Sequence, residues 1–449
     1  MGGILIIFIK RTICCFLLML FLNITLVTRV TPGTAAAVVA GIALGAFYIY
    51  FNFVPRKDKS PLRRQRVLIG GYELALAAIT CFTLEVLAYC YVLLKGVEIG
   101  THILVINALV CAVLLFVLLF NGVVRIFTCS GQLGIIPRIS LLLFWWMPVV
   151  NIIILRKFLG ISVSEYKYTV EKRRLNEDRK HEELCKTKYP ILMVHGIFFR
   201  DWKNFNYWGR IPKELTDNGA VIYYGSHQSS ASVEQCAGEL KECILDIMQN
   251  TGCEKVNIVA HSKGGLDSRY AISCLDMGKH VASLTTINTP HLGCNYVGKL
   301  LEMIPKKTVL AIGKGYESIF TKLGDDSPDF FSGLKDLTDK ECERLNGIMK
   351  DIPGVLYQSV GSNMRSYSSA MFPLNMGYGI IKLFGGGEND GLVSTKSMEW
   401  GDFLGVLRPD GRKGISHGDV IDLTRKNIEG FDVCEFYVDL INKLKLKGL

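Results

Sequence analysis

The chain has 449 residues, of which 49% are hydrophobic, and its mean hydropathy is +0.28. These values exclude an ordinary soluble enzyme along the whole length, because the apolar excess lies almost entirely before residue 160. The formal net charge of +10 is spread over loops, and beside an apolar region it favours anionic lipid headgroups over nucleic acid as a partner. The 14 cysteines form no C-x-x-C pair and no spacing typical of zinc, so free thiols are predicted.

Several apolar runs in residues 1–159 approach the length that crosses a bilayer. They lie near 12–28, 34–54, 67–94, 102–124 and 139–155. The first run follows Lys10 and Arg11 without a convincing cleavage site, so it is interpreted as an uncleaved anchor. A buried core helix would explain any single run. Together the runs predict an all-α, multi-pass transmembrane region.

The charges leave the orientation of these runs open. The basic loop 55–66 is expected on the cytoplasmic side. A fifth crossing would then place the rest of the chain outside, whereas Arg156, Lys157 and later basic residues favour inside. Pro148 within the fifth run also permits a re-entrant hairpin instead of a crossing.

After the apolar region, residues 160–187 carry mixed charge at helical spacing and are predicted to form a charged linker. From residue 188 onward, short apolar segments alternate with helical patterns. Strands are expected at 189–196, 220–225, 255–260, 281–287 and 354–361, with helices at 233–252, 264–275 and 432–446. This alternation predicts a mostly parallel sheet covered by helices on both faces, so residues 188–449 are expected to form one α/β domain.

The stretch "VNIVAHSKGGLDSRY" (256–270) places Ser262 between a strand and two glycines. A nucleophilic serine at a tight strand-to-helix turn needs small residues two positions before and two positions after it. Ala260 and Gly264 satisfy that demand. A helix-capping serine is the plainer alternative. The strand, the small residues and the helix together predict that Ser262 is a nucleophile.

A serine nucleophile needs a base, an acid that orients the base, and an oxyanion site. In this kind of fold the acid and the histidine follow the serine in that order. Asp390 in "GGGENDGLVS" and His417 in "GISHGDVIDL" meet the order, although singly they are typical of a turn and a surface loop. The backbone amides of Ile197 and Lys263 are the predicted oxyanion donors, and the Lys263 side chain is expected in solvent.

The motifs "YPILMVHGIF", "VNIVAHSKGGLDSRY", "LTTINTPHLG" and "NDGLVS" together resemble bacterial triacylglycerol lipases of the α/β-hydrolase fold. The resemblance covers residues 188–449 and implies a lipid ester substrate, the triad and oxyanion amides named above, and no redox cofactor or nucleotide. Because the similar lipases are bacterial, the resemblance also implies that the predicted spans lie in the cell membrane of a bacterium. It also implies a structural Ca²⁺ near the catalytic histidine, for which Asp419 matches one carboxylate ligand. No acid upstream of "NDGLVS" supplies the second, so calcium is not required by the sequence.

The sequence therefore predicts a membrane-anchored serine hydrolase that cleaves carboxylic esters of lipids through an acyl-enzyme; the oligomeric state is left open. A phospholipase or lipid acyltransferase with the same triad is one alternative, and an inactive membrane-bound binding module is another. Residues 296–323, apolar with interspersed lysines, are expected to form a lid over the acyl-chain pocket, with a core helix pair as the alternative.

Overall fold

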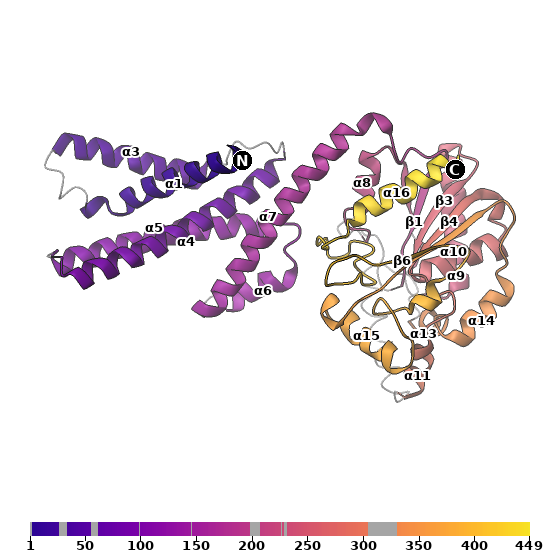
Figure 1. Ribbon diagram of the computed structural model, residues 1–449. Coiled ribbons are helices and arrows are strands. Elements are labelled where there is room, and N and C mark those ends of the chain that lie inside the picture. Colours follow the sequence, from indigo (N-terminus) through magenta and orange to yellow (C-terminus); the bar gives the residue numbers. More distant parts are fainter. Residues whose placement is uncertain are drawn as a thin grey trace. The chain divides into compact units, whose positions relative to one another are not determined.

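The structure is a computed structural model, and it describes residues 2–26, 34–54, 62–97, 99–144, 146–197, 207–225, 227–228, 231–303 and 330–449. The chain divides into two compact units, Met1–Arg174 and Leu175–Leu449. The boundary falls within a helix. The two units are described separately below (Figure 1).

The N-terminal unit is made of helices. Its first members are α1 (Gly2–Leu22), α3 (Thr34–Phe53), α4 (Arg63–Lys95) and α5 (Thr101–Cys129). Among the described residues, three helices are long and apolar enough to cross a membrane, at Ala35–Phe53, Arg63–Lys95 and Thr101–Cys129. These match the second, third and fourth predicted spans. α1 covers residues 12–22 of the first predicted span, 12–28, and residues 27 and 28 lie outside the described residues.

The fifth predicted span, 139–155, is not a single helix. Its residues are divided between the short α6 (Ile135–Leu143) and the long α7 (Pro148–Asp178). The amide at the first position of a helix has no carbonyl partner within the helix. Proline, which has no amide hydrogen, can therefore begin α7 at Pro148 without losing a hydrogen bond. Much of the charged segment predicted as a linker continues α7 as far as Asp178.

The C-terminal unit is built around a six-stranded sheet in which every neighbouring pair is parallel, in the order β2-β1-β3-β4-β5-β6. The strands are β1 (Ile191–Val194), β2 (Ile222–Tyr224), β3 (Val256–His261), β4 (Val281–Ile287), β5 (Leu356–Ser362) and β6 (Asp402–Leu407). The first five confirm the predicted strands. β6 was not predicted, because it begins with an acidic residue and Gly405 interrupts its short apolar pattern.

Helices cover both faces of the sheet, as Figure 1 shows. Successive side chains of a strand point to opposite faces. Ile191 and Met193 of β1 therefore pack with α8 (Ile211–Asp217) and α16 (Val433–Leu446), whereas Leu192 and Val194 pack with α9 (Val233–Thr251) and α10 (Lys263–Cys274). A mostly parallel sheet between two helical layers confirms the predicted α/β-hydrolase fold.

Shorter helices complete the C-terminal unit. They are α11 (Asn295–Met303), α13 (Phe330–Lys335), α14 (Asp339–Ile348) and α15 (Leu374–Leu383), with 3₁₀ turns at Lys180–Glu182, Gly278–His280, Tyr367–Ser369 and Thr395–Met398. Residues 304–329, which include most of the predicted lid, lie outside the described residues.

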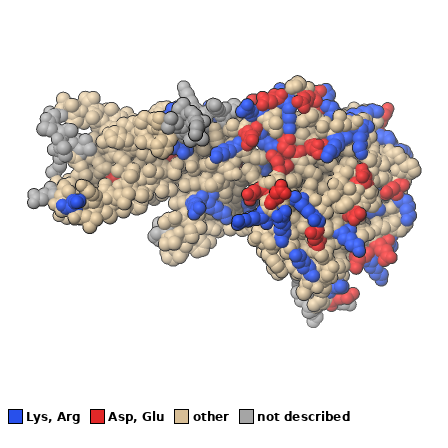
Figure 2. All heavy atoms as spheres, in the orientation of Figure 1, with Lys and Arg blue, Asp and Glu red and all other residues tan. Residues whose placement is uncertain are grey.

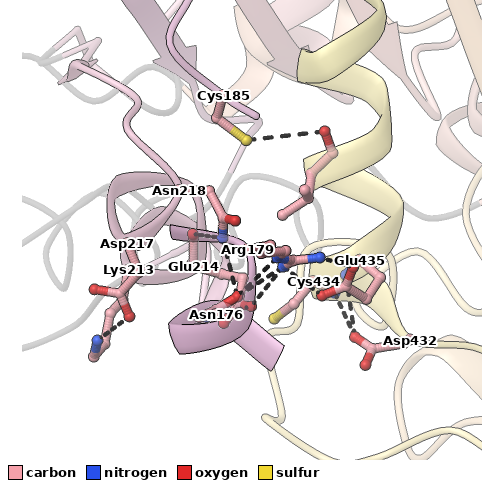
Figure 3. A network of polar contacts seen from close by, with 11 residues as sticks. Asn176, Arg179, Cys185, Lys213, Glu214, Asp217, Asn218, Asp432, Cys434 and Glu435 are labelled. Carbon is pink, nitrogen blue, oxygen red and sulfur yellow. Dashed lines mark hydrogen bonds and ion pairs between the residues drawn. The ribbon is translucent and has the colours of Figure 1, made fainter. Parts of the chain in front are cut away.

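The last turn of α7 is fixed to the C-terminal unit by Arg179, which Figure 3 shows at the centre of a polar network. Arg179 donates from Nη1 and Nη2 to the two carboxylate oxygens of Glu435 on α16, at 2.6 and 2.8 Å. It also donates to Asn176 Oδ1, at 2.7 Å from Nη2, and lies 3.5 Å from a carboxylate oxygen of Glu214 on α8. Arg179 and Glu214 are about 10% exposed, so this network is only weakly screened by water.

We expect Arg179→Ala to lower the free energy of unfolding of the C-terminal unit by about 2–3 kcal/mol, because two carboxylates lose a charged donor. Lys213→Ala is the matched control, since the Lys213–Asp217 pair on the adjacent α8 is exposed and should contribute little. Urea denaturation of the full-length protein, followed by tryptophan fluorescence, measures both. Equal small losses would show that the Arg179 network does not hold the α7 terminus.

Candidate active site

Ser262 lies in the turn between β3 and α10, in a strained backbone conformation with φ 56° and ψ −132°. The turn is possible because the neighbouring elements approach closely. A Cβ atom on Gly264 would lie 2.3 Å from the carbonyl oxygen of His195, and one on Gly265 would lie 2.2 Å from Thr289 Oγ1. Ala260, which stands where many such turns have glycine, is fully buried, so its methyl group fits. Strain at a single serine between tightly packed elements is typical of a nucleophile elbow.

The structure brings Asp390 and His417 together. His417 Nδ1 lies 2.6 Å from Asp390 Oδ2, and the His417 amide donates to the Asp390 carbonyl at 2.9 Å. Both side chains are buried, at 9% and 0% exposure. A carboxylate in this position fixes the tautomer of the imidazole and stabilises the imidazolium.

Asp390 accepts hydrogen bonds from three other groups besides His417. Its Oδ1 accepts hydrogen bonds from the amides of Leu392 and Val393, at 2.8 and 2.7 Å. Its Oδ2 also accepts from Asn288 Nδ2 at 2.7 Å. The sequence analysis missed Asn288, which lies in the "NTPHLG" motif after β4. Four donors satisfy the buried carboxylate and keep it aimed at His417.

Ser262 and His417 come together at the same edge of the sheet. The ring of His261, the residue before Ser262, lies 4.5 Å from the ring of His417, centroid to centroid. The structure records no hydrogen bond between Ser262 Oγ and His417, both of which lie in the described part of the chain. Such bonds are often long in the absence of substrate.

The predicted oxyanion turn abuts the serine. A Cβ atom on Gly196 would lie 2.7 Å from Ser262 Cβ, so the chain at Gly196 and Ile197 passes directly beside the nucleophile. The Gly196 amide donates to the Tyr207 hydroxyl at 3.0 Å, and that hydroxyl lies 2.6 Å from His261 Nδ1. Burial and the neighbouring His417 hold the pKa of His261 well below its ordinary value, so its ring is neutral. Tyr207 therefore links the oxyanion turn to the ring that packs on His417.

The expectation that the Lys263 side chain lies in solvent is wrong. It is 1% exposed, and its Nζ donates to Asp267 Oδ1 at 2.7 Å and to Cys236 Sγ at 3.4 Å. Asp267 lies one turn after Lys263 on α10, so the pair itself is local, whereas the burial of the pair and its contact with Cys236 depend on the packing of α9 against α10. A buried ammonium requires a partner of this kind. The Lys263 amide, at the first position of α10, still faces the turn.

Asp419 does not present a carboxylate free for calcium. Its Oδ2 accepts from Ser416 Oγ at 2.6 Å and from the Ser416 amide at 3.2 Å. Within the described residues no group of three His, Cys, Asp or Glu side chains is placed to hold a metal ion. A single half-buried carboxylate, one of whose oxygens is already bonded, does not by itself fit a hard divalent cation, which takes six to eight oxygen ligands.

The chain is similar to known esterases and lipases. Residues 188–322 match a protein family described as "Putative serine esterase (DUF676)". The chain is 31% identical to a triacylglycerol lipase of Vibrio cholerae over 287 residues, which cover 59% of this chain and 89% of the relative. It is 26% identical to triacylglycerol lipase 2 of Saccharomyces cerevisiae, over 54% of this chain and 74% of the relative. Among solved structures, a Staphylococcus hyicus lipase matches with a TM-score of 0.44 and 18% identity, covering 58% of this chain and 98% of that one.

We expect Asn288→Ala to lower kcat for ester hydrolysis by about 10- to 100-fold, because a hydrogen bond to a charged group contributes about 1.5–3 kcal/mol. Ser362→Ala is the matched control. Ser362 Oγ accepts from the same Asn288 Nδ2 at 2.6 Å but has no contact with Asp390 among the described hydrogen bonds. A loss in Asn288→Ala no larger than in Ser362→Ala would show that the bond to Asp390 does not matter.

We expect a chelator to change the melting temperature by less than a few degrees, because the Asp419 carboxylate is bonded within the protein. Differential scanning fluorimetry with and without EDTA measures this. A fall of about ten degrees or more would reveal a bound cation that stabilises the fold, and Asp419→Ala would then show whether Asp419 is a ligand.

Proposed function

The chain belongs to the family of triacylglycerol lipases, and on that premise we propose that it is a membrane-anchored hydrolase that cleaves carboxylic esters of lipids through an acyl-enzyme. The observation that carries the proposal is the arrangement at one edge of the sheet. A buried Asp390–His417 pair with a 2.6 Å contact lies beside the strained turn that carries Ser262. This is the order and type of residues that acyl transfer by a serine requires.

In the proposed mechanism Ser262 Oγ attacks the ester carbonyl while His417 Nε2 accepts its proton. The tetrahedral intermediate then collapses, and His417 returns the proton to the leaving alcohol. Water, deprotonated by the same imidazole, attacks the acyl-serine; the bond to Ser262 Oγ then breaks, His417 returns the proton to that oxygen, and the fatty acid is released. Asp390 stays ionised throughout and holds His417 in the tautomer that has Nε2 free to accept.

The developing negative charge on the ester oxygen is bound by two backbone amides, those of Ile197 and Lys263. Both belong to segments that the packing holds rigidly, the first by Gly196 against Ser262 and the second by the buried Lys263–Asp267 pair. Donors that need no reorganisation stabilise a transition state most effectively. Removal of one oxyanion donor lowers kcat by about 10²–10³-fold at such sites, and we expect each of the two amides to contribute a factor of this size.

The N-terminal unit supports the membrane part of the proposal. Three described helices have the length and composition of membrane spans, and in Figure 2 the surface of this unit shows few charged atoms. We propose a multi-pass anchor in a cell membrane. An enzyme held at a bilayer meets lipid substrates without first diffusing to an interface.

Transfer of the acyl group to an alcohol instead of water would use the same three side chains. Analysis of the products with and without a lipid alcohol as acceptor distinguishes the two reactions. An accumulation of new ester at the expense of free fatty acid would identify an acyltransferase.

We expect Ser262→Ala to lower ester hydrolysis by about 10⁴-fold or more, because the nucleophilic oxygen is removed while the fold is unchanged. The variant should also lose labelling by a fluorophosphonate probe. Full-length protein in detergent, assayed with a short-chain ester, provides the measurement.

Ser273→Ala is the control, since Ser273 is also on α10 but its hydroxyl bonds to the Lys350 carbonyl, away from the site. Wild-type activity and labelling in Ser262→Ala would mean that another residue is the nucleophile. Absent labelling in the wild-type protein would identify the inactive binding module.

A further inference from the structure

The turn that follows α5 is bound by a residue from the middle of α7. Glu165 accepts hydrogen bonds from Ser130 Oγ at 2.6 Å and from the amides of Gly131 and Gln132, at 2.9 and 3.1 Å. Glu165 is 5% exposed. Its carboxylate therefore satisfies the backbone at the point where the chain leaves α5, and the contact fixes Glu165 at the depth of the α5 C-terminus.

Two basic residues also bond to the same end of α5. Arg138 of α6 donates to the carbonyls of Ser130 and Phe127, at 2.7 and 3.2 Å. Arg64, in the first turn of α4, donates to the Cys129 carbonyl at 2.7 Å. Hydrogen-bonded groups lie within about 3 Å of one another. The start of α4, the end of α5, Arg138 and Glu165 are consequently all at one surface of the helical unit.

Between Arg138 and Glu165 the chain is apolar and turns back. Residues 139–155 contain no charged side chain. The two helices and the turn between them expose large apolar side chains, among them Ile136, Leu142, Leu143, Trp146, Val149 and Ile152. The surface over α6 and the start of α7 is uncharged in Figure 2. Exposed apolar side chains in such number need a partner that is itself apolar.

The length of this hairpin limits how far it reaches. α6 has nine residues, which span about 14 Å at 1.5 Å per residue. The hydrocarbon core of a bilayer is about 30 Å thick. One arm therefore reaches about halfway, and Glu165 shows that the second arm returns to the surface from which the first arm started.

We propose that the α6–α7 hairpin enters a single leaflet of the bilayer and does not cross it, so that the chain emerges on the same side as the basic loop before α4. The occupant of the exposed apolar surface is the acyl region of that leaflet, continuous with the lipid around the spanning helices. Arg156 and Lys157, at the end of the uncharged stretch, lie at the level of the headgroups and favour anionic lipid.

The hairpin determines on which side of the membrane the catalytic unit lies. Basic segments that flank spans remain on the cytoplasmic side, so the basic residues of 55–66 place that unit in the cytoplasm. Resting on the proposed lipid ester hydrolysis, this inference further gives the substrate as a lipid of the cytoplasmic leaflet.

Epitope accessibility in sealed membranes tests the sidedness of the full-length protein. The epitope is placed after Leu449, with references inserted in the loops 55–61 and 96–100, which flank α4. The C-terminal epitope and the epitope at 55–61 should respond alike to added protease, either both cleaved or both protected. Cleavage together with the one at 96–100 would overturn the proposal, whatever the esterase activity of the same membranes.

Quenching of tryptophan fluorescence by brominated phospholipids tests insertion of the hairpin. The full-length protein is reconstituted with lipids brominated near the middle of the acyl chain. Trp146 is exposed, so the wild type should lose more fluorescence than Trp146→Phe, while both hydrolyse a soluble ester equally. Equal quenching of the two proteins would show that the hairpin stays outside the leaflet. If neither the wild type nor Trp146→Phe hydrolyses the ester, the proposed enzymatic function is contradicted, while the quenching result still tests the insertion.

Discussion

The close approach of β1, β3 and α10 is the constraint on which the rest of the catalytic unit depends. Gly264 leaves no room for a side chain against the His195 carbonyl, and Gly196 leaves none against Ser262. Because these backbones touch, Ser262 is forced into its strained conformation and the oxyanion turn passes directly beside it. The strain is stabilised by the buried sheet around it, where Val256–His261 is fully inaccessible to solvent.

Charges are buried around this turn in two ways that have different consequences. Asp390 is satisfied by two amides, Asn288 and His417, so its charge is available to the imidazole. Lys263 and Asp267 satisfy each other beneath the elbow, and burial raises the pKa of Asp267 to about 6. Removing one member of such a pair typically costs about 3–5 kcal/mol. In the proposed mechanism the first arrangement orients His417, and the second stabilises the turn that carries Ser262.

In the helical unit the corresponding constraint is the level along the helices at which polar side chains find partners. Polar groups within a membrane protein must find partners at their own level. Glu165, Arg138 and Arg64 all bond to the end of α5, and this ties four separate segments to one surface. The proposed hairpin, in place of the fifth crossing that the hydropathy of 139–155 favours, rests on these bonds. The proposed position of the catalytic unit in the cytoplasm follows from that level, whereas a count of apolar runs gives the opposite side.

The sequence by itself determined the features that depend on local pattern. The period of apolar residues gave five of the six strands and the main helices. The spacing of small residues around Ser262 and the order of Asp390 and His417 gave the candidate triad, because such rules act over short stretches or along the chain. Other features depend on contacts between distant segments. Asn288 lies 102 residues from Asp390, Lys263 is buried by helices packed on it, and Glu165 fixes a turn 35 residues before it. Only the tertiary structure could decide these, because hydrogen bonding and burial are properties of three-dimensional neighbours that no local pattern records.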